Sequence, residues 1–148
     1  MQFADNVSID RKKKIVIRRL RDVHCALQTK KNPFVEIQKG FLSAGIPKAS
    51  FAFDELMLLT ATTAIQSLDV RYLHCEGLGT GELNFISSIA FAQNGKLEWA
   101  FQRLSSWLPP AAARRALAEI IKIANYMQRV GLFIRLRGEF INCDLSNF

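Results

Sequence analysis

Apolar positions recur along most of the chain with the spacing of amphipathic helices rather than with the strict alternation of strands. From about residue 9 to residue 29, one helical face is apolar and the opposite face is cationic. The apolar face consists of Val16, Leu20, Val23 and Leu27. Ser8 stands at the position of an N-cap, so this segment predicts a long basic amphipathic helix. The run from Ile15 to Ile17 alone would also suit an edge strand.

Proline, glycine and capping residues divide the rest of the chain into shorter helical segments. The predicted segments run from Pro33 to Gly45, over 51–67, over 82–93, over 97–108, and from Pro109 to Gly131. Residues near 70–75 and 132–142 favour β structure. We therefore predict a mainly α fold: a single-domain bundle of about five to six helices with a minor β element. Residues 1–7 are expected to be a flexible N-terminus, and 8–148 to be one domain.

Two of these segments, 51–67 and 82–93, are apolar on nearly every side. Such helices are typical of the middle of a bundle or of a contact between subunits. Trp99 and Trp107 lie at the edges of the apolar stripe of 97–108 and add further apolar surface. The sequence therefore predicts a homodimer.

The 148 residues are 49% hydrophobic, enough for one core without disulfides or metal. The first residues lack the apolar segment of a secretory signal. No stretch reaches the ~18 uncharged apolar residues that a membrane span needs. Three cysteines, an odd number, are typical of a reducing compartment. These features predict a cytoplasmic protein without a membrane span.

The net charge of +7 lies entirely in the first third of the chain. Residues 1–48 hold eleven Lys or Arg and four Asp or Glu, whereas residues 49–148 hold nine of each. The cations of the first predicted helix form a stripe of Arg11, Lys14, Arg18 and Arg21. Such a stripe can bind an acidic protein, a nucleic acid or anionic lipid, or it can be a solvated outer face. These four residues are the predicted partner-binding site.

A glycine-rich stretch, HCEGLGTGEL, separates the β-like residues 70–75 from a predicted helix. It resembles the first motif of Rossmann-like S-adenosylmethionine-dependent methyltransferases, with Gly77, Gly79 and Gly81 at the family's spacing. The resemblance covers about eleven residues and implies a cofactor loop. Cys75 stands where that family has an acidic residue, and the alternating strands and helices of such a domain are missing. The pattern favours a turn in which Thr80 caps the next helix.

Two histidine–cysteine pairs, His24–Cys25 and His74–Cys75, together with Cys143 are numerous enough for a zinc site. Adjacent residues point in different directions on a helix or a strand, and no zinc-like spacing is present. No nucleophile–base motif or carboxylate pair can be named. We expect no metal, no cofactor and no catalytic residues.

These observations predict a small non-catalytic regulatory or adaptor protein. It would bind an acidic partner through the basic helix, as a homodimer. One alternative is a nucleic-acid-binding protein that uses the same helix, although no helix-turn-helix or interleaved aromatics accompany it. The other is an enzyme that binds S-adenosylmethionine or a nucleotide at Gly77–Gly81.

Overall fold

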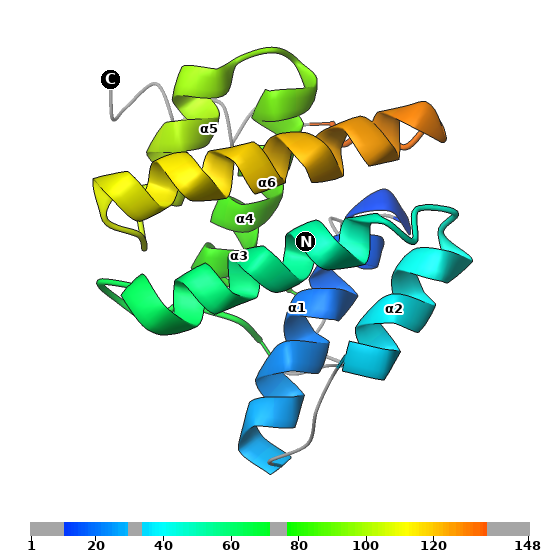
Figure 1. Ribbon diagram of the computed structural model, residues 1–148, viewed down its shortest axis with the longest axis horizontal. Coiled ribbons are helices and arrows are strands. Elements are labelled where there is room, and N and C mark those ends of the chain that lie inside the picture. Colours follow the sequence, from blue (N-terminus) through cyan, green and yellow to red (C-terminus); the bar gives the residue numbers. More distant parts are fainter. Residues whose placement is uncertain (1–10, 30–33, 72–76, 136–148) are drawn as a thin grey trace.

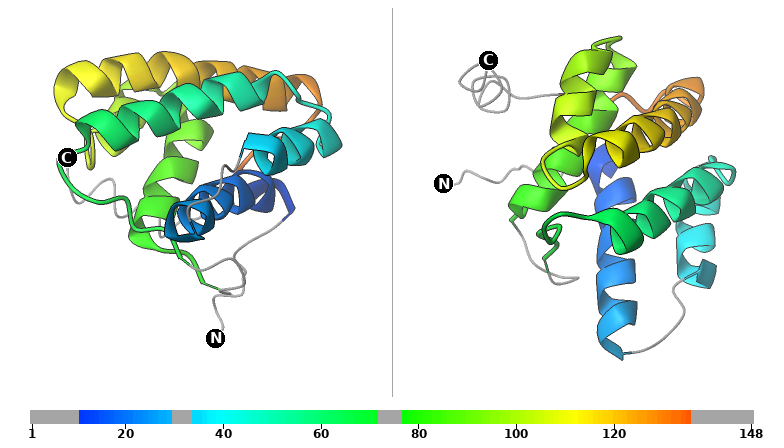
Figure 2. Two further views of the ribbon diagram at one scale, coloured as in Figure 1. Left: turned by 60° about the horizontal axis from the view of Figure 1, so that its bottom comes forward. Right: turned by 60° about the vertical axis from the view of Figure 1, so that its left-hand side comes forward.

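The computed structural model describes residues 11–29, 34–71 and 77–135, which form six α-helices (Figure 1). They are α1 (Arg11–Thr29), α2 (Phe34–Ser43), α3 (Ala49–Thr63), α4 (Thr80–Gln93), α5 (Leu97–Leu104) and α6 (Pro110–Arg129). α3 and α6 lie side by side, and α4 packs against α5 and α6 (Figures 1 and 2). α1 packs against α2 and α4. The predicted mainly α bundle of about five to six helices is confirmed.

The centre of the bundle is α4, which is buried almost continuously from Phe85 to Phe91. A chain of ring contacts passes through it and joins four parts of the molecule. Phe41 of α2 contacts Phe53 of α3 at 5.6 Å between ring centroids, and Phe53 contacts Phe85 at 5.9 Å. Phe85 stacks on Trp107, between α5 and α6, at 6.1 Å. α4 corresponds to one of the two segments that are apolar on nearly every side. Its position in the middle of the bundle is the one that this pattern predicts.

α6 is the longest helix, and its sequence explains its limits. Pro110 opens it, because proline needs no amide partner in the first helical turn. Gly131 follows its end with a φ of 78°, a conformation that glycine adopts without strain. Buried alanines on its inner face allow α3 and α4 to approach closely (Ala112, Ala113, Ala116 and Ala124).

The predicted minor β element is wrong at the positions that the structure describes. Residues 70–71 and 132–135 form no strand, and the remaining residues of both predicted segments lie outside the described ranges. Side chains bind the backbone here instead of a neighbouring strand. The Gln93 amide nitrogen donates to the Leu132 carbonyl at 2.9 Å, and its oxygen accepts from the Ile134 amide at 2.8 Å. These bonds satisfy backbone groups that a β ladder would otherwise use.

The predicted helix over 51–67 is shifted towards the N-terminus. α3 begins at Ala49 and ends at Thr63. Ser50, the predicted cap, lies inside the helix, and its hydroxyl donates to the Pro47 carbonyl at 2.8 Å. Beyond Thr63 the chain leaves the helix, and the Ile65 amide donates to the carbonyl of Trp107 at 2.9 Å.

The two tryptophans differ from the surface positions predicted for them. Trp107 is buried, and its indole nitrogen donates to the Thr60 hydroxyl at 3.1 Å. Trp99 is half-buried and packs edge-on against Phe91, with ring centroids 5.2 Å apart. Trp107 therefore adds to the core and not to an exposed apolar surface.

Candidate functional site

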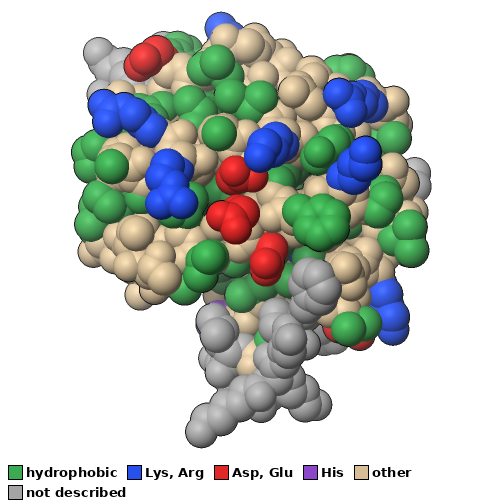
Figure 3. Space-filling model, in the orientation of Figure 1, with side chains coloured by type: hydrophobic (Ala, Val, Ile, Leu, Met, Phe, Trp, Pro, Cys, Tyr) green, Lys and Arg blue, Asp and Glu red, His purple; other side chains and the backbone are tan. Residues whose placement is uncertain are grey.

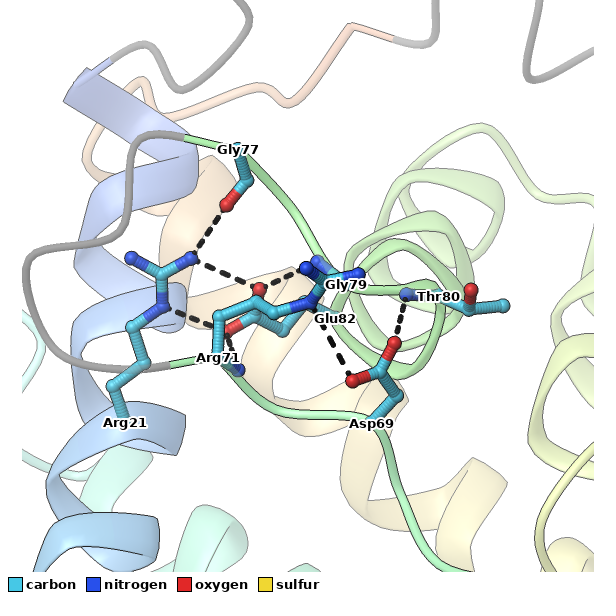
Figure 4. Close-up of polar contacts among 7 residues, drawn as sticks. All are labelled: Arg21, Asp69, Arg71, Gly77, Gly79, Thr80 and Glu82. Carbon is cyan, nitrogen blue, oxygen red and sulfur yellow. Dashed lines mark hydrogen bonds and ion pairs between the residues drawn. The ribbon is translucent and has the colours of Figure 1, made fainter.

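The glycine-rich loop is the N-terminal cap of α4. Gly79 occupies the N-cap position, and Thr80 is the first helical residue, so the predicted Thr80 cap is a correction. The Gly79 amide donates to Oε1 of Glu82 at 2.8 Å. The Thr80 amide donates to Oδ2 of Asp69 at 2.9 Å (Figure 4). The Glu82 amide donates to the Asp69 carbonyl. Carboxylates of the protein thus complement the positive end of this helix.

Glu82 is fully buried, and its carboxylate accepts from four donors. Arg21 of α1 supplies two of them, Nε to Oε2 at 2.7 Å and Nη2 to Oε1 at 3.0 Å. The amides of Gly79 and Arg71 supply the other two. A buried charge is tolerated when it is paired and its remaining lone pairs are bonded, and both conditions hold here.

Arg21 does not belong to the exposed basic stripe that the sequence predicts. Its side chain is only 3% exposed, and its Nη2 also donates to the Gly77 carbonyl at 2.8 Å (Figure 4). Helical spacing places Arg21 at the edge of the basic stripe, so its long side chain can turn towards the core. The signal in the sequence is Glu82, a carboxylate at the start of an otherwise apolar segment, because such a residue needs a cation.

Gly79 and Gly81 are required for this packing, since a side chain at either position has no room. A Cβ on Gly81 would lie 2.3 Å from the backbone nitrogen of Asp69. A Cβ on Gly79 would lie 2.7 Å from the Asp69 carbonyl oxygen. Gly77 differs, because nothing lies within 4 Å of the corresponding Cβ. A cofactor phosphate or carboxylate at this helix terminus would have to displace Asp69 from the Thr80 amide.

Two predicted site residues, Lys14 and Arg18, lie exposed one turn apart on α1. Neither forms an ion pair with any residue that the structure describes. Arg11 begins the same helix, and its side chain lies outside the described part of the structure. Like charges at this spacing repel each other by about 0.2–0.5 kcal/mol. We call Lys14 and Arg18 the basic face of α1.

Among the other cations of the first third, Arg19 has a carboxylate partner, and Lys39 and Lys48 lie near the α2–α3 turn. Arg19 donates to Asp22 at 3.0 Å and lies over Gly40 of α2, where a Cβ would meet its guanidinium. Lys39 is 4.0 Å from a Glu36 oxygen, and both side chains are well exposed. Lys48 is exposed in the turn before α3.

The face formed by α3 and α6 carries mixed charge. On this face, Lys and Arg side chains stand apart from one another around a group of Asp and Glu side chains (Figure 3). Hydrophobic side chains are exposed between them. Such a face has no single-signed patch for a polyanion, so the basic face of α1 is the better candidate for binding one.

Two apolar grooves flank α3. The larger, about 680 Å³, lies between α1, α3 and residues 64–70, and its rim includes Leu58 and Ile65, which are 57% and 66% exposed. Asp54 and His24 are its charged or titratable lining residues. The smaller, about 400 Å³, lies between α2 and the start of α3 and is lined by Val35, Gln38, Lys39, Leu42, Pro47, Lys48, Ser50 and Phe51. We call it the α2–α3 groove.

The residues of the suggested zinc site do not meet among the described ranges. On α1, His24 is half-buried and Cys25 is exposed. His74, Cys75 and Cys143 lie outside the described residues. Within those ranges, no three His, Cys, Asp or Glu side chains gather closely enough to hold a metal ion. In the same part of the chain, no helix is both long and apolar enough to cross a membrane.

No known family model matches the chain, and no curated protein or solved structure is significantly similar to it.

Proposed function

We propose that the protein is a non-catalytic regulatory or adaptor protein that binds an acidic protein partner through the basic face of α1. The observation that carries the proposal is the exposed pair Lys14 and Arg18, which repel each other and have no carboxylate partner among the described residues. An external carboxylate cluster would relieve this repulsion. Arg11 precedes them by one turn and belongs to the proposed contact, whereas Arg21 serves the fold.

The surroundings of these cations favour a protein over a nucleic acid. With Arg21 buried, the basic stripe is shorter than the sequence predicts, so fewer phosphates can be neutralised. α1 packs against α2, and exposed apolar side chains lie between α2 and α3, namely Val35, Leu42 and Phe51. A phosphate backbone offers nothing to cover them, whereas a protein surface does.

The test compares polyanions. Fluorescein-labelled poly-L-glutamate, a mixed-sequence DNA duplex and a single-stranded RNA are titrated across a salt series from about 50 to 200 mM. We expect poly-L-glutamate to bind and to be released by Lys14→Glu with Arg18→Glu. Tighter binding of duplex or RNA, with the steep salt dependence of phosphate contacts, would support the nucleic-acid alternative and contradict the proposal.

We further infer that the protein forms a homodimer through α3. This helix is apolar on nearly every side, yet α6 and α2 cover only part of it, and Leu58 and Phe51 are well exposed. α4 has the same pattern and is buried in the centre, so α3 is the helix left for a subunit contact. Leu58 together with Ile65 forms the proposed contact, in the larger groove.

A further inference from the structure

The α2–α3 groove combines exposed apolar side chains with positive charge. Val35 and Leu42 lie two turns apart on the outer side of α2, and Phe51 faces them from the first turn of α3. Their exposed fractions are 55%, 65% and 64%. Lys39 and Lys48 belong to the same lining. Apolar surface of this kind, bordered by charge, marks an interaction site more often than a scattered single side chain does.

The core does not require apolar residues at these positions. On α2 the inward side is already formed by Ile37 and Phe41, which are 2% and 0% exposed. Phe53 fills the inward side of α3. Val35, Leu42 and Phe51 therefore remain on the water side after folding, and their apolar area is left for a partner to bury.

The charge of the groove selects the kind of partner. Its lining has two lysines and no carboxylate. The nearest described acid on α2, Glu36, is 4.0 Å from Lys39 with both side chains about two-thirds exposed, a geometry that holds a lysine only weakly. Apolar anchors in a pocket with cations at the edge fit a segment whose apolar side chain stands between acidic residues.

We propose that the α2–α3 groove binds a short acidic segment of the partner, with its apolar side chain held between Val35, Leu42 and Phe51 and its carboxylates at Lys39 and Lys48. This inference deepens the proposed function and rests on it, because it names the recognition element of the acidic partner. The groove volume of about 400 Å³ is near the lower end of ligand pockets, so it suits a few side chains rather than a large ligand.

The experiment selects ligands from a phage-displayed library of random dodecapeptides on the chain of 148 residues. Selected peptides are then synthesised, and their affinities are measured for wild type, Phe51→Ala and the double variant Lys39→Glu with Lys48→Glu. Phe133→Ala is the matched control, since Phe133 is also an exposed phenylalanine but lines neither of the two grooves that flank α3. Denaturation midpoints equal to that of wild type establish that each variant is folded.

We expect acidic peptides with a central apolar residue. Phe51→Ala and the lysine reversal should bind them at least about tenfold more weakly, and Phe133→Ala should bind them as tightly as wild type does. The inference would be overturned if the selected peptides were basic or uncharged, if Phe51→Ala bound them as tightly as wild type does, or if no peptide were enriched on wild type. Competition by a DNA duplex at equal charge would also overturn it, in favour of a nucleic-acid surface.

The variant Lys14→Glu with Arg18→Glu separates the two proposals. If this variant alone failed to bind acidic peptides and the groove variants bound them normally, the proposed function would stand. The proposal that the groove is the binding site would then be overturned. Loss on the groove variants alone would support the groove and contradict the contact at the basic face of α1.

Discussion

Arg21 of α1 and Glu82 of α4 lie 61 residues apart in the sequence and form a buried ion pair with two hydrogen bonds, of 2.7 and 3.0 Å. The same guanidinium donates to the Gly77 carbonyl, so one side chain binds both the first helix and the glycine-rich loop to the start of α4. An arginine that the sequence assigns to partner binding is thus a structural residue.

Removing one member of this pair should strongly destabilise the fold. Arg21→Met leaves the Glu82 carboxylate buried without its cation, and we expect a loss of about 3–5 kcal/mol in the free energy of unfolding. Arg21→Lys should restore only part of it, because an ammonium cannot form the paired contacts of a guanidinium. Urea denaturation measures these values. Arg18→Met, on the exposed side, should change stability by no more than about 0.5 kcal/mol.

The double variant Arg21→Met with Glu82→Leu tests the cause of that loss. If the uncompensated charge is responsible, the double variant should be more stable than Arg21→Met alone. A double variant that loses the sum of both single effects would contradict this explanation.

Asp69 should stabilise α4 through its bond to the Thr80 amide. Asp69→Ala removes the acceptor, and we expect a loss of about 0.5–2 kcal/mol, as for other helix caps. Asp69→Asn keeps an oxygen acceptor and should lose less. Asp54→Ala is the matched control on an exposed acid of α3. Thermal unfolding would contradict the capping role if both Asp69 variants matched wild type.

The glycines of the loop should differ sharply in tolerance. Gly81→Ala forces a Cβ against the Asp69 backbone and should unfold or strongly destabilise the protein, whereas Gly77→Ala should be nearly neutral.

Gly77→Ala also allows a fair test of the cofactor alternative, since the fold should survive it. If S-adenosylmethionine or a nucleotide raised the melting temperature of wild type, and Gly77→Ala removed this rise, the cofactor alternative would be supported. We expect no rise.

Self-association should depend on the larger groove. Light scattering should give twice the mass of the chain for wild type and the mass of one chain for Leu58→Glu with Ile65→Glu. Val35→Glu is the matched control, since Val35 is an exposed apolar residue in the other groove. A monodisperse wild-type monomer would contradict the homodimer.

Much of the bundle could be predicted from sequence, because helical periodicity and turn residues act locally. Gly131 follows the end of α6 as expected, and α6 begins at Pro110, one residue after the predicted Pro109. The all-round apolar pattern of α4 predicts its central position. The site was harder to predict. Helical spacing gives the direction in which Arg21 leaves the helix but not the partner that it meets on α4. The end of α3 was missed because Ala64 and Ile65 continue its apolar character, whereas the bond from the Ile65 amide to the Trp107 carbonyl holds the chain outside the helix there.

The glycine loop illustrates the same limit. Its spacing suits either a cofactor turn or a helix cap, and only the position of Asp69 shows which amides are already bonded. Asp69 lies eleven residues before Thr80, beyond the reach of a local motif.

The most direct test of the central claim is quantitative affinity purification from nuclease-treated cell extract. The baits are wild type, Lys14→Glu with Arg18→Glu, and the matched control Arg115→Glu with Lys122→Glu, which makes the same charge change on exposed residues of α6. We expect an acidic protein that is retained by wild type and by the α6 control and is lost from the α1 variant. Identical captured proteins on all three baits would contradict it.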